Sequence, residues 1–104
     1  MFDATRFGGS SAMEFQWDPR KARRNERQHG VTFGEAAEVF DDELSSSSSD
    51  PDHSSGEARF VIFGRSRRGR FLVVGYTERG DIVRIISSRP MTRRERQAYE
   101  SEEG

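Results

Sequence analysis

Arginine side chains are the first candidates for chemistry in this 104-residue chain. Residues 59–96 hold eleven arginines against three acidic residues, and residues 18–29 carry a local net charge of +3. Arginine binds phosphate oxygens in a planar, bidentate manner, so this clustering favours a polyanionic partner, although the net charge of the whole chain is only −1. From charge alone, a solvated arginine-rich surface is an equally good explanation.

Most of these arginines lie in and around a predicted β-meander. Three β-rich runs, 59–65, 71–77 and 82–88, are separated by two short polar turns. Each turn contains a glycine, Gly69 or Gly80, the residue that most easily adopts the positive φ of a hairpin turn. The pattern predicts three consecutive antiparallel strands.

The alternation of residue types within the runs predicts a register. With loops at 67–69 and 79–80, the expected opposite pairs on the apolar face are Phe60–Tyr76, Ile62–Val74, Gly64–Leu72, Tyr76–Val83 and Val74–Ile85. We expect this face to pack against helices.

The same register places two arginines on the other face of the sheet. Arg59 is expected beside Thr77, and Arg84 beside Gly75. Because Gly75 has no side chain, space would remain between the two guanidinium groups, and an anionic ligand could lie there. The sequence therefore predicts an anion site at one end of the sheet.

Composition excludes several kinds of protein. The chain has no cysteine, which rules out disulfides, thiolate zinc sites and a cysteine nucleophile. No apolar run is long enough to cross a membrane, and the N-terminus lacks the apolar core of a signal peptide, so we expect a cytoplasmic protein. Asp52, His53 and Glu57 lie close together on a serine-rich loop, but this is a weak metal-ligand pattern, and we expect neither a metal nor a cofactor.

Other segments complete an expected α+β fold, with helices beside an antiparallel sheet. Residues 1–12 are expected to be a disordered lead, and residues 13–104 a single domain. The expected elements outside the meander are a short strand at 14–17, helices at 19–28 and 33–41, a weakly encoded edge strand within 44–49, and a helix at 93–101. The helix starts are indicated by Asp18-Pro19, by Thr32 with Glu35, and by Thr92 with Glu95.

Lys21, Asn25 and His29 recur every four residues in the first helical segment, so they fall on one stripe of that helix. The simpler interpretation is a solvated stripe, or a His29 that only caps the helix end. The alternative is a functional surface shared by the three side chains.

Several motifs, taken in order along the chain, resemble the BrnT family of toxins from bacterial type II toxin–antitoxin systems. They are Trp17-Asp18-x-x-Lys21-x-x-x-Asn25-x-x-x-His29-Gly30-Val31-x-Phe33, Asp50-Pro-Asp-His53, Glu57-x-Arg59, Tyr76-Thr-Glu-Arg79, Arg84-Ile-Ile-Ser87-x-Arg89 and Arg93-Arg-Glu-Arg96-x-x-Tyr99. Together they span about residues 13–100. The chain departs from the family at the serine run 45–49, where relatives have a more apolar strand, and at Pro90-Met91, where they often have Lys-Ala.

The resemblance implies a RelE-like fold and a ribonuclease that arrests translation. It also implies neutralisation by a BrnA-like antitoxin with a ribbon-helix-helix DNA-binding part. The complex would repress its own operon, so operator DNA is expected to be bound only through the antitoxin. We expect two toxins and two antitoxins in the complex.

Cleavage of RNA by attack of its own 2′-OH on the adjacent phosphate needs no metal, but it requires charge stabilisation and the transfer of two protons. We expect Arg59 and Arg84 to stabilise the charge. Proton transfer is assigned to Lys21, Glu57 or His29, which the sequence does not separate. The residues expected to hold flanking phosphates are Arg79, Arg89 and Arg93.

Two other functions stay open at this point. One is a catalytically silent protein that binds RNA or only its antitoxin. The other is a small DNA-binding regulator, which is less favoured because the segment 19–28 lacks the apolar stripe that a helix-turn-helix pair needs for packing.

Overall fold

The computed structural model describes residues 3–6, 13–50 and 57–103. Its strands form one six-stranded sheet in the order β1-β2-β6-β5-β4-β3. The strands are β1 (Asp3–Arg6), β2 (Glu14–Trp17), β3 (Ser46–Ser49), β4 (Phe60–Arg65), β5 (Phe71–Arg79) and β6 (Ile82–Pro90). The helices are α1 (Pro19–His29), α2 (Phe33–Glu38), the 3-10 turn η1 (Val39–Asp41) and α3 (Arg93–Glu103). The expected α+β class is confirmed.

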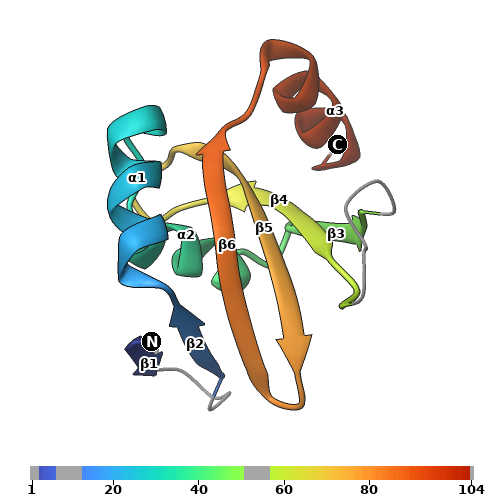
Figure 1. Ribbon diagram of the computed structural model, residues 1–104. Coiled ribbons are helices and arrows are strands. Elements are labelled where there is room, and N and C mark those ends of the chain that lie inside the picture. Colours follow the sequence, from blue (N-terminus) through green and yellow to red (C-terminus); the bar gives the residue numbers. More distant parts are fainter. Residues whose placement is uncertain (1–2, 7–12, 51–56, 104) are drawn as a thin grey trace.

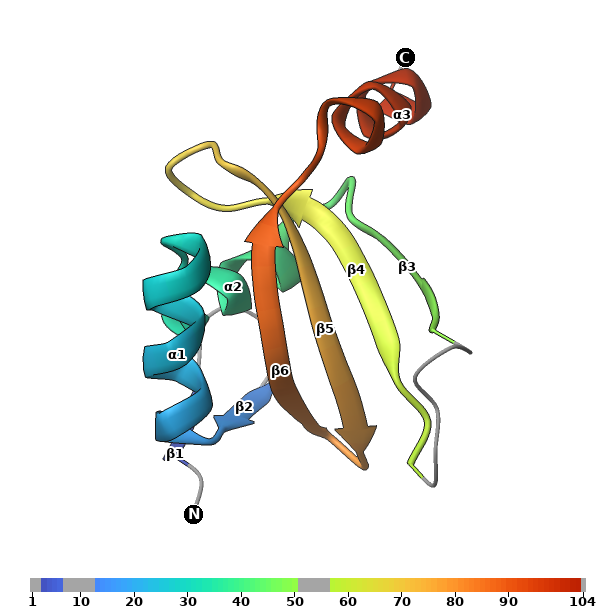
Figure 2. The same ribbon diagram turned by 45° about the horizontal axis from the view of Figure 1, so that its top comes forward.

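Helix α1 begins and ends where its cap residues require. The Asp18 carboxylate accepts a hydrogen bond from the backbone N–H of Arg20 at 2.9 Å, and Pro19 occupies the first turn. Gly30 ends the helix with a φ of 69°, a left-handed conformation that glycine adopts without steric cost. In both ribbon views α1 runs beside β6, at the place where β2 has already left the edge of that strand (Figures 1 and 2).

Helix α2 and η1 cover one face of the sheet (Figure 1). The Thr32 hydroxyl accepts from the N–H of Glu35 at 3.0 Å, as the capping pattern predicts. The core cluster on this face consists of Phe15, Val31, Phe33, Ala36, Ala37, Val39, Ile62, Leu72, Val74, Tyr76, Val83 and Ile85, with Phe60 packed against it. The apolar residues of the meander expected on that face are therefore confirmed as core residues, with Phe60 at the edge of the cluster.

The first hairpin of the meander has the predicted register, with Phe60 opposite Tyr76 and Ile62 opposite Val74. The predicted register of the second hairpin is wrong by two residues, because the turn is centred on Gly80-Asp81 and Arg79 pairs with Ile82. A two-residue slip keeps the side chains between the turn and the Tyr76–Ile85 pair on their expected faces, but beyond that pair a register shift raises the difference to three residues.

The sheet extends beyond the meander on both sides. Strand β2 pairs with β6 in parallel, so the sheet is mixed and not purely antiparallel. On the other side, the four serines of β3 pair with β4 as the outer strand. Residues 3–6 form β1 against β2, which corrects the expectation of a disordered lead at these four positions. The remaining residues of the expected lead lie outside the described residues.

Helix α3 is joined to the sheet by a few specific contacts. Its capping box is complete, because Thr92 and Glu95 exchange N–H to side-chain hydrogen bonds of 2.8 and 3.1 Å. Tyr99 packs edge-on against Phe71, with ring centroids 5.8 Å apart, and its hydroxyl donates to the Asp42 carboxylate. The helix thus stands over the end of the meander where β6 finishes (Figure 1).

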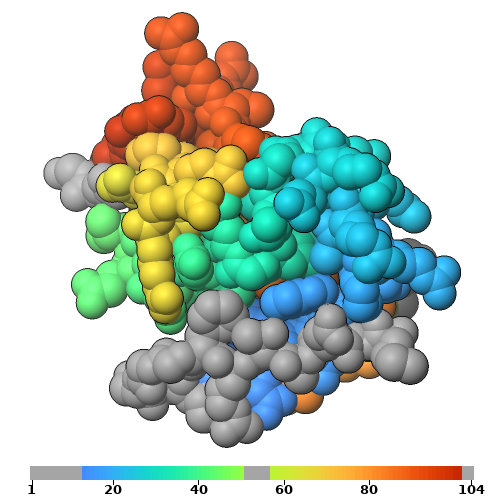
Figure 3. Space-filling view, turned by 90° about the vertical axis from the view of Figure 1, so that its left-hand side faces the viewer, coloured from blue at the N-terminus to red at the C-terminus, as the bar shows by residue number. Residues whose placement is uncertain are grey.

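The turn between β4 and β5 is held against the helices. Figure 3 shows this turn, in yellow, lying against α2 and the end of α1. Arg70 donates to both the buried Glu35 carboxylate and the carbonyl of Gly30, the latter at 2.9 Å. The Arg70 hydrogen bonds lower the pKa of Glu35 against the opposing effect of burial, so this carboxylate stays charged and fixes the turn.

Candidate functional site

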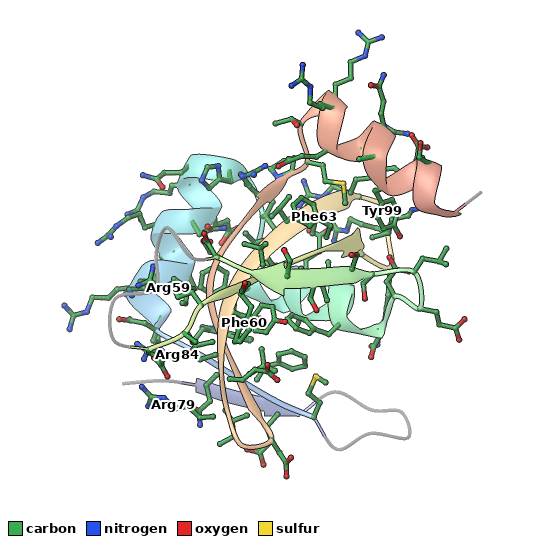
Figure 4. All side chains as sticks on the ribbon, turned by 90° about the vertical axis from the view of Figure 1, so that its right-hand side faces the viewer. Arg59, Phe60, Phe63, Arg79, Arg84 and Tyr99 are labelled. Atoms are coloured by element: carbon green, nitrogen blue, oxygen red, sulfur yellow. The ribbon has the colours of Figure 1, made fainter. Side chains whose placement is uncertain are left out.

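The sheet face opposite the helices carries the arginines that the sequence singled out. The Asp50 N–H donates to the Arg59 carbonyl at 2.8 Å, so these residues continue the pairing of β3 with β4. Thr77 pairs with Arg84 in the next pair of strands. Figure 4 shows Arg59, Arg84 and Arg79 gathered at one end of the sheet, with Phe63 and Tyr99 at the other. The prediction that Arg59 and Arg84 lie at one end of the sheet is therefore confirmed.

The predicted neighbour of Gly75 is wrong. Ser87, and not Arg84, lies opposite Gly75, because a register shift between Gly75 and Tyr76 adds one residue to β6 in addition to the shifted turn. A Cβ atom at position 75 would come within 2.7 Å of the Ser87 Oγ. Gly75 thus makes room for a hydroxyl group and not for a gap between two guanidinium groups.

A groove of about 280 Å³ runs between α1 and β6 on this side of the molecule. It is lined by Lys21, Arg24, Asn25, Gln28, His29, Arg59, Ile86 and Ser87. The helical stripe of Lys21 and His29 therefore faces Arg59, which comes from a segment about thirty residues later in the chain. Four cationic or ionisable side chains and the Ser87 hydroxyl therefore line one groove, and an anion with oxygen acceptors fits this lining.

Asn25 connects the two walls of the groove, helix α1 and strand β6, by hydrogen bonds. Its side-chain amide donates to the carbonyl of Ser88 at 2.8 Å and to the carbonyl of Val31 at 3.0 Å. Its Oδ1 accepts from the N–H of Ser88 at 3.0 Å. Asn25 is 6% exposed. It therefore docks the helix on the edge of β6, and the solvated-stripe interpretation does not hold for this member of the stripe.

Glu57 connects the arginines at the end of the sheet. Its carboxylate binds Arg79 in a bidentate manner, at 2.7 Å from Nε and 3.3 Å from Nη2. The hydrogen bonds from Arg79 lower the pKa of Glu57, and the nearby charges of Arg84 and Arg59 lower it further. An ionised Glu57 can accept a proton but is a poor proton donor at neutral pH.

None of the three predicted phosphate-binding arginines, Arg79, Arg89 and Arg93, lines the groove. Arg84 and Glu57 do not line it either, and they lie with Arg79 at the end of the sheet. The Arg89 guanidinium binds Glu95 of α3 at 2.8 and 2.9 Å, so it positions that helix. Hydrogen bonds from Arg89 hold the pKa of Glu95 at about 2. Arg93 is exposed on α3.

Some sequence hypotheses fall outside what the structure describes. His53 and Asp52 lie in the segment 51–56, which is not among the described residues. Within the described ranges, no group of three or more His, Asp or Glu side chains is placed to hold a metal ion. No helix in the described part of the chain is long and apolar enough to cross a membrane.

The sequence alone missed Ser87 as a groove residue, and Arg24 and Gln28 with it. Ser87 was hidden by the extra residue in β6, because the alternation of that strand gave no sign of a bulge. Arg24 and Gln28 follow Lys21 and precede His29 at helical spacing, so a wider stripe would have included them. Thr77, opposite Arg84 in the ladder, is only 2% exposed, and its Oγ1 has no hydrogen-bond partner among the described residues.

Comparisons with known proteins bear on the family and the fold. The family model for the ribonuclease toxin BrnT of type II toxin–antitoxin systems matches residues 17–95. The crystal structure of the ribonuclease toxin BrnT from Brucella abortus superimposes with a TM-score of 0.54 at 20% sequence identity, covering 74% of this chain and 94% of that one. That identity supports a shared fold alone. The search of curated proteins gave no match.

The family match covers the whole groove, including Lys21, His29, Arg59 and Ser87, as well as Arg84 at the end of the sheet. The chain belongs to the BrnT family of ribonuclease toxins of type II toxin–antitoxin systems.

Proposed function

We propose that this protein is a metal-independent endoribonuclease whose active site is the groove between α1 and β6. In the proposed reaction a 2′-oxygen attacks the adjacent phosphorus and the bond from phosphorus to the 5′-oxygen breaks. The products are a 2′,3′-cyclic phosphate and a 5′-hydroxyl end. One protein group takes the proton of the 2′-OH, and another protonates the leaving oxygen.

The observation that supports this proposal best is that Lys21, His29, Arg59 and Ser87 line one open groove. These groups come from different parts of the chain, so the fold and not local sequence brings them together. The lining of the groove supplies both positive charge, which binds the backbone of single-stranded RNA, and groups that can exchange protons.

Arg59 and Arg84 are assigned to charge stabilisation. Fixed guanidinium donors stabilise the extra negative charge on the phosphorus in the transition state, which is the part that a metal ion plays in other nucleases. The positive charges of Arg59 and Arg84 favour the ionised form of Glu57, which binds Arg79. We assign it to holding Arg79 and orienting the arginine cluster.

His29 and Lys21 are the remaining proton-transfer candidates. They are eight residues apart on α1, which separates their backbones by about 12 Å. One phosphate cannot contact both at the same time unless the long Lys21 side chain extends toward it. We assign proton transfer to His29, because imidazole changes protonation near neutral pH, and phosphate binding to Lys21.

Cleavage of a defined RNA by the purified chain in excess EDTA tests the proposal. We expect cleavage in EDTA and products with 2′,3′-cyclic phosphate ends, identified by mass spectrometry. Cleavage that stops with EDTA and returns with added magnesium contradicts metal independence. RNA binding without cleavage, in both the presence and the absence of magnesium, would instead support the non-catalytic alternative.

The partner proposed for this toxin is a BrnA-like antitoxin with a ribbon-helix-helix domain, encoded in the same operon. Family membership implies an antitoxin, and the exposed arginines of α3 and of the site give it a basic surface to cover. We propose two copies of each chain in a cytoplasmic complex that represses its operon. Gel filtration with light scattering of the co-expressed pair tests this stoichiometry, and separate elution of the two chains at micromolar concentration counts against it.

A further inference from the structure

A second, smaller hollow of about 140 Å³ adjoins the groove on the open face of the sheet. It shares Arg59, Ile86 and Ser87 with the groove, so the two spaces meet at these side chains. Its other lining residues on this face are Asp50, Val61 and Gly75. Figure 4 labels Arg59, one of the side chains that the two spaces share.

The floor of the hollow is the backbone at Gly75. This glycine is in the interior of β5, opposite Val61 on one side and Ser87 on the other. It does not have the positive φ that Gly69 and Gly80 use in the turns. The Ser87 hydroxyl lies against Gly75, so a flat ring in this hollow would lie beside that hydroxyl, between Val61 and Ile86.

Asp50 gives the hollow a specific polar edge. Because Asp50 lies opposite Arg59 in the continued ladder, its side chain is on the same face of the sheet. An ionised carboxylate only accepts hydrogen bonds. Among the four bases, guanine presents two adjacent donors on its Watson–Crick edge, N1–H and N2–H, which match the two oxygens of a carboxylate.

We infer that this hollow binds a guanine base next to the phosphate held at Arg59, with Asp50 as the residue that selects guanine. The inference rests on the proposed function, because it places RNA phosphate in the adjoining groove. It adds a base preference that the groove alone does not give. A bidentate contact of this kind discriminates against other bases by about tenfold or more.

Binding of RNA analogues that cannot be cleaved tests the inference separately from catalysis. The probes are short, fluorescently labelled 2′-O-methyl oligouridines, with the central base left as uracil or replaced by guanine, adenine or cytosine. Kd is measured by fluorescence anisotropy for the full-length chain. We expect the guanine probe to bind about tenfold more tightly than the all-uracil probe.

The variant Asp50→Asn should reduce that ratio to about twofold or less, while Asp81→Asn should leave it unchanged. Asp81 is an exposed carboxylate in the β5–β6 turn, so it reports the general effect of removing one negative charge. Gly75→Val should fill the floor of the hollow and weaken the guanine probe most. Circular dichroism melting checks that each variant is folded.

Equal Kd values for the four probes with the unaltered chain would overturn the inference. So would an Asp50→Asn variant that keeps the guanine preference. If the probes bind with the expected preference but unmodified RNA is not cleaved, the base site stands and the proposed catalytic function fails. If RNA is cleaved but the probes show no preference, the proposed catalytic function stands and the guanine site is excluded.

Discussion

Asn25 and Ser88 are 63 residues apart, and they exchange two hydrogen bonds as neighbouring strands of a sheet do. The N–H of Ser88 donates to Asn25 Oδ1 at 3.0 Å, and the Asn25 amide donates to the carbonyl of Ser88 at 2.8 Å. A side chain on a helix thus satisfies the edge of β6 after β2 has ended. This contact fixes the distance between α1 and the sheet, and therefore the width of the groove between Lys21 or His29 and Arg59.

Replacing Asn25 by alanine should destabilise the fold. The change leaves the buried backbone groups of Ser88 and the carbonyl of Val31 without partners, at a cost of roughly 1–3 kcal/mol for each unpaired group. We expect a loss of about 3 kcal/mol or more in the free energy of unfolding, measured by urea denaturation. Arg23→Ala, at an exposed position of the same helix, is the matched control and should change stability little. Equal midpoints for the two variants would mean that Asn25 does not dock the helix.

Arg59→Ala and Arg84→Ala should each lower RNA cleavage by at least ~100-fold, the scale seen when one fixed transition-state donor is removed. Both side chains are on the open face, so melting temperatures should stay close to that of the unaltered chain. Initial cleavage rates and growth arrest in expressing cells are the two measurements.

Arg67→Ala and Arg68→Ala are controls for general loss of positive charge. Arg67 binds Asp41 at 3.1 Å on the surface of the distant turn, and Arg68 lies 3.9 Å from Glu35. The Arg67–Asp41 pair is exposed on both sides and contributes little to stability, and Arg68 is itself exposed and too far from Glu35 for a hydrogen bond. If Arg84→Ala is as active and as toxic as the parent, charge stabilisation at that end of the sheet is excluded, and the groove residues of α1 become the centre of the site.

Local sequence determines much of this fold. The first hairpin follows from alternating apolar residues and a turn glycine at Gly69, and α1 follows from Asp18-Pro19 and Gly30. The second hairpin is less determined, since Gly80 is compatible with either of two loops and the extra residue in β6 leaves no mark in the sequence. The parallel pairing of β2 with β6 depends on long-range packing that no local pattern encodes.

Part of the candidate site could also be predicted from the sequence, and part could not. Arg59 and Arg84 could be placed on the same face of the sheet from the sequence, because a slip of two residues does not change the face on which a side chain lies. The position of His29 and Arg59 in one groove could not be predicted, because it requires α1 to lie beside the edge of β6. That placement depends on the buried amide of Asn25, which looks like any other polar residue on a helical stripe.

Stability in acid should depend on the contact between Arg89 and Glu95. The pKa of Glu95 is lowered from its ordinary value of 4.5 to about 2 in the folded chain. A depressed carboxyl pKa contributes stability that is complete above the ordinary pKa and is lost as the pH falls toward the folded-state pKa. Glu95→Gln should therefore lower the melting temperature at neutral pH and have much less effect at about pH 2.

The comparison between variant and parent matters because Glu35 and Asp42 also have lowered pKa values and weaken the fold in acid. Their effect is common to both proteins and cancels in the difference. Glu100→Gln removes an exposed carboxylate of the same helix and should show a small, nearly constant difference across the pH range. A Glu95→Gln deficit that is independent of pH would exclude this ion pair as its source.

Lys21 and His29 should have different kinetic effects, although both line the groove. If His29 transfers a proton in the rate-limiting step, His29→Ala should lower kcat by about 10²–10⁴-fold with little change in KM. Added imidazole should restore part of the rate, because a small diffusible base can occupy the vacated space. Lys21→Ala removes a phosphate-binding charge, so it should mainly raise KM and reduce the salt dependence of binding.

The control for these two variants is Arg23→Ala, which removes a charge from the same helix at a position that does not line the groove, and it should leave kcat and KM near those of the parent. The reverse pattern, with kcat lost in Lys21→Ala and KM raised in His29→Ala, would exchange the two roles. If neither variant lowers kcat, the proton acceptor is elsewhere, and Glu57→Gln becomes the next variant to measure, since its ionised carboxylate lies beside Arg79 at the same end of the sheet.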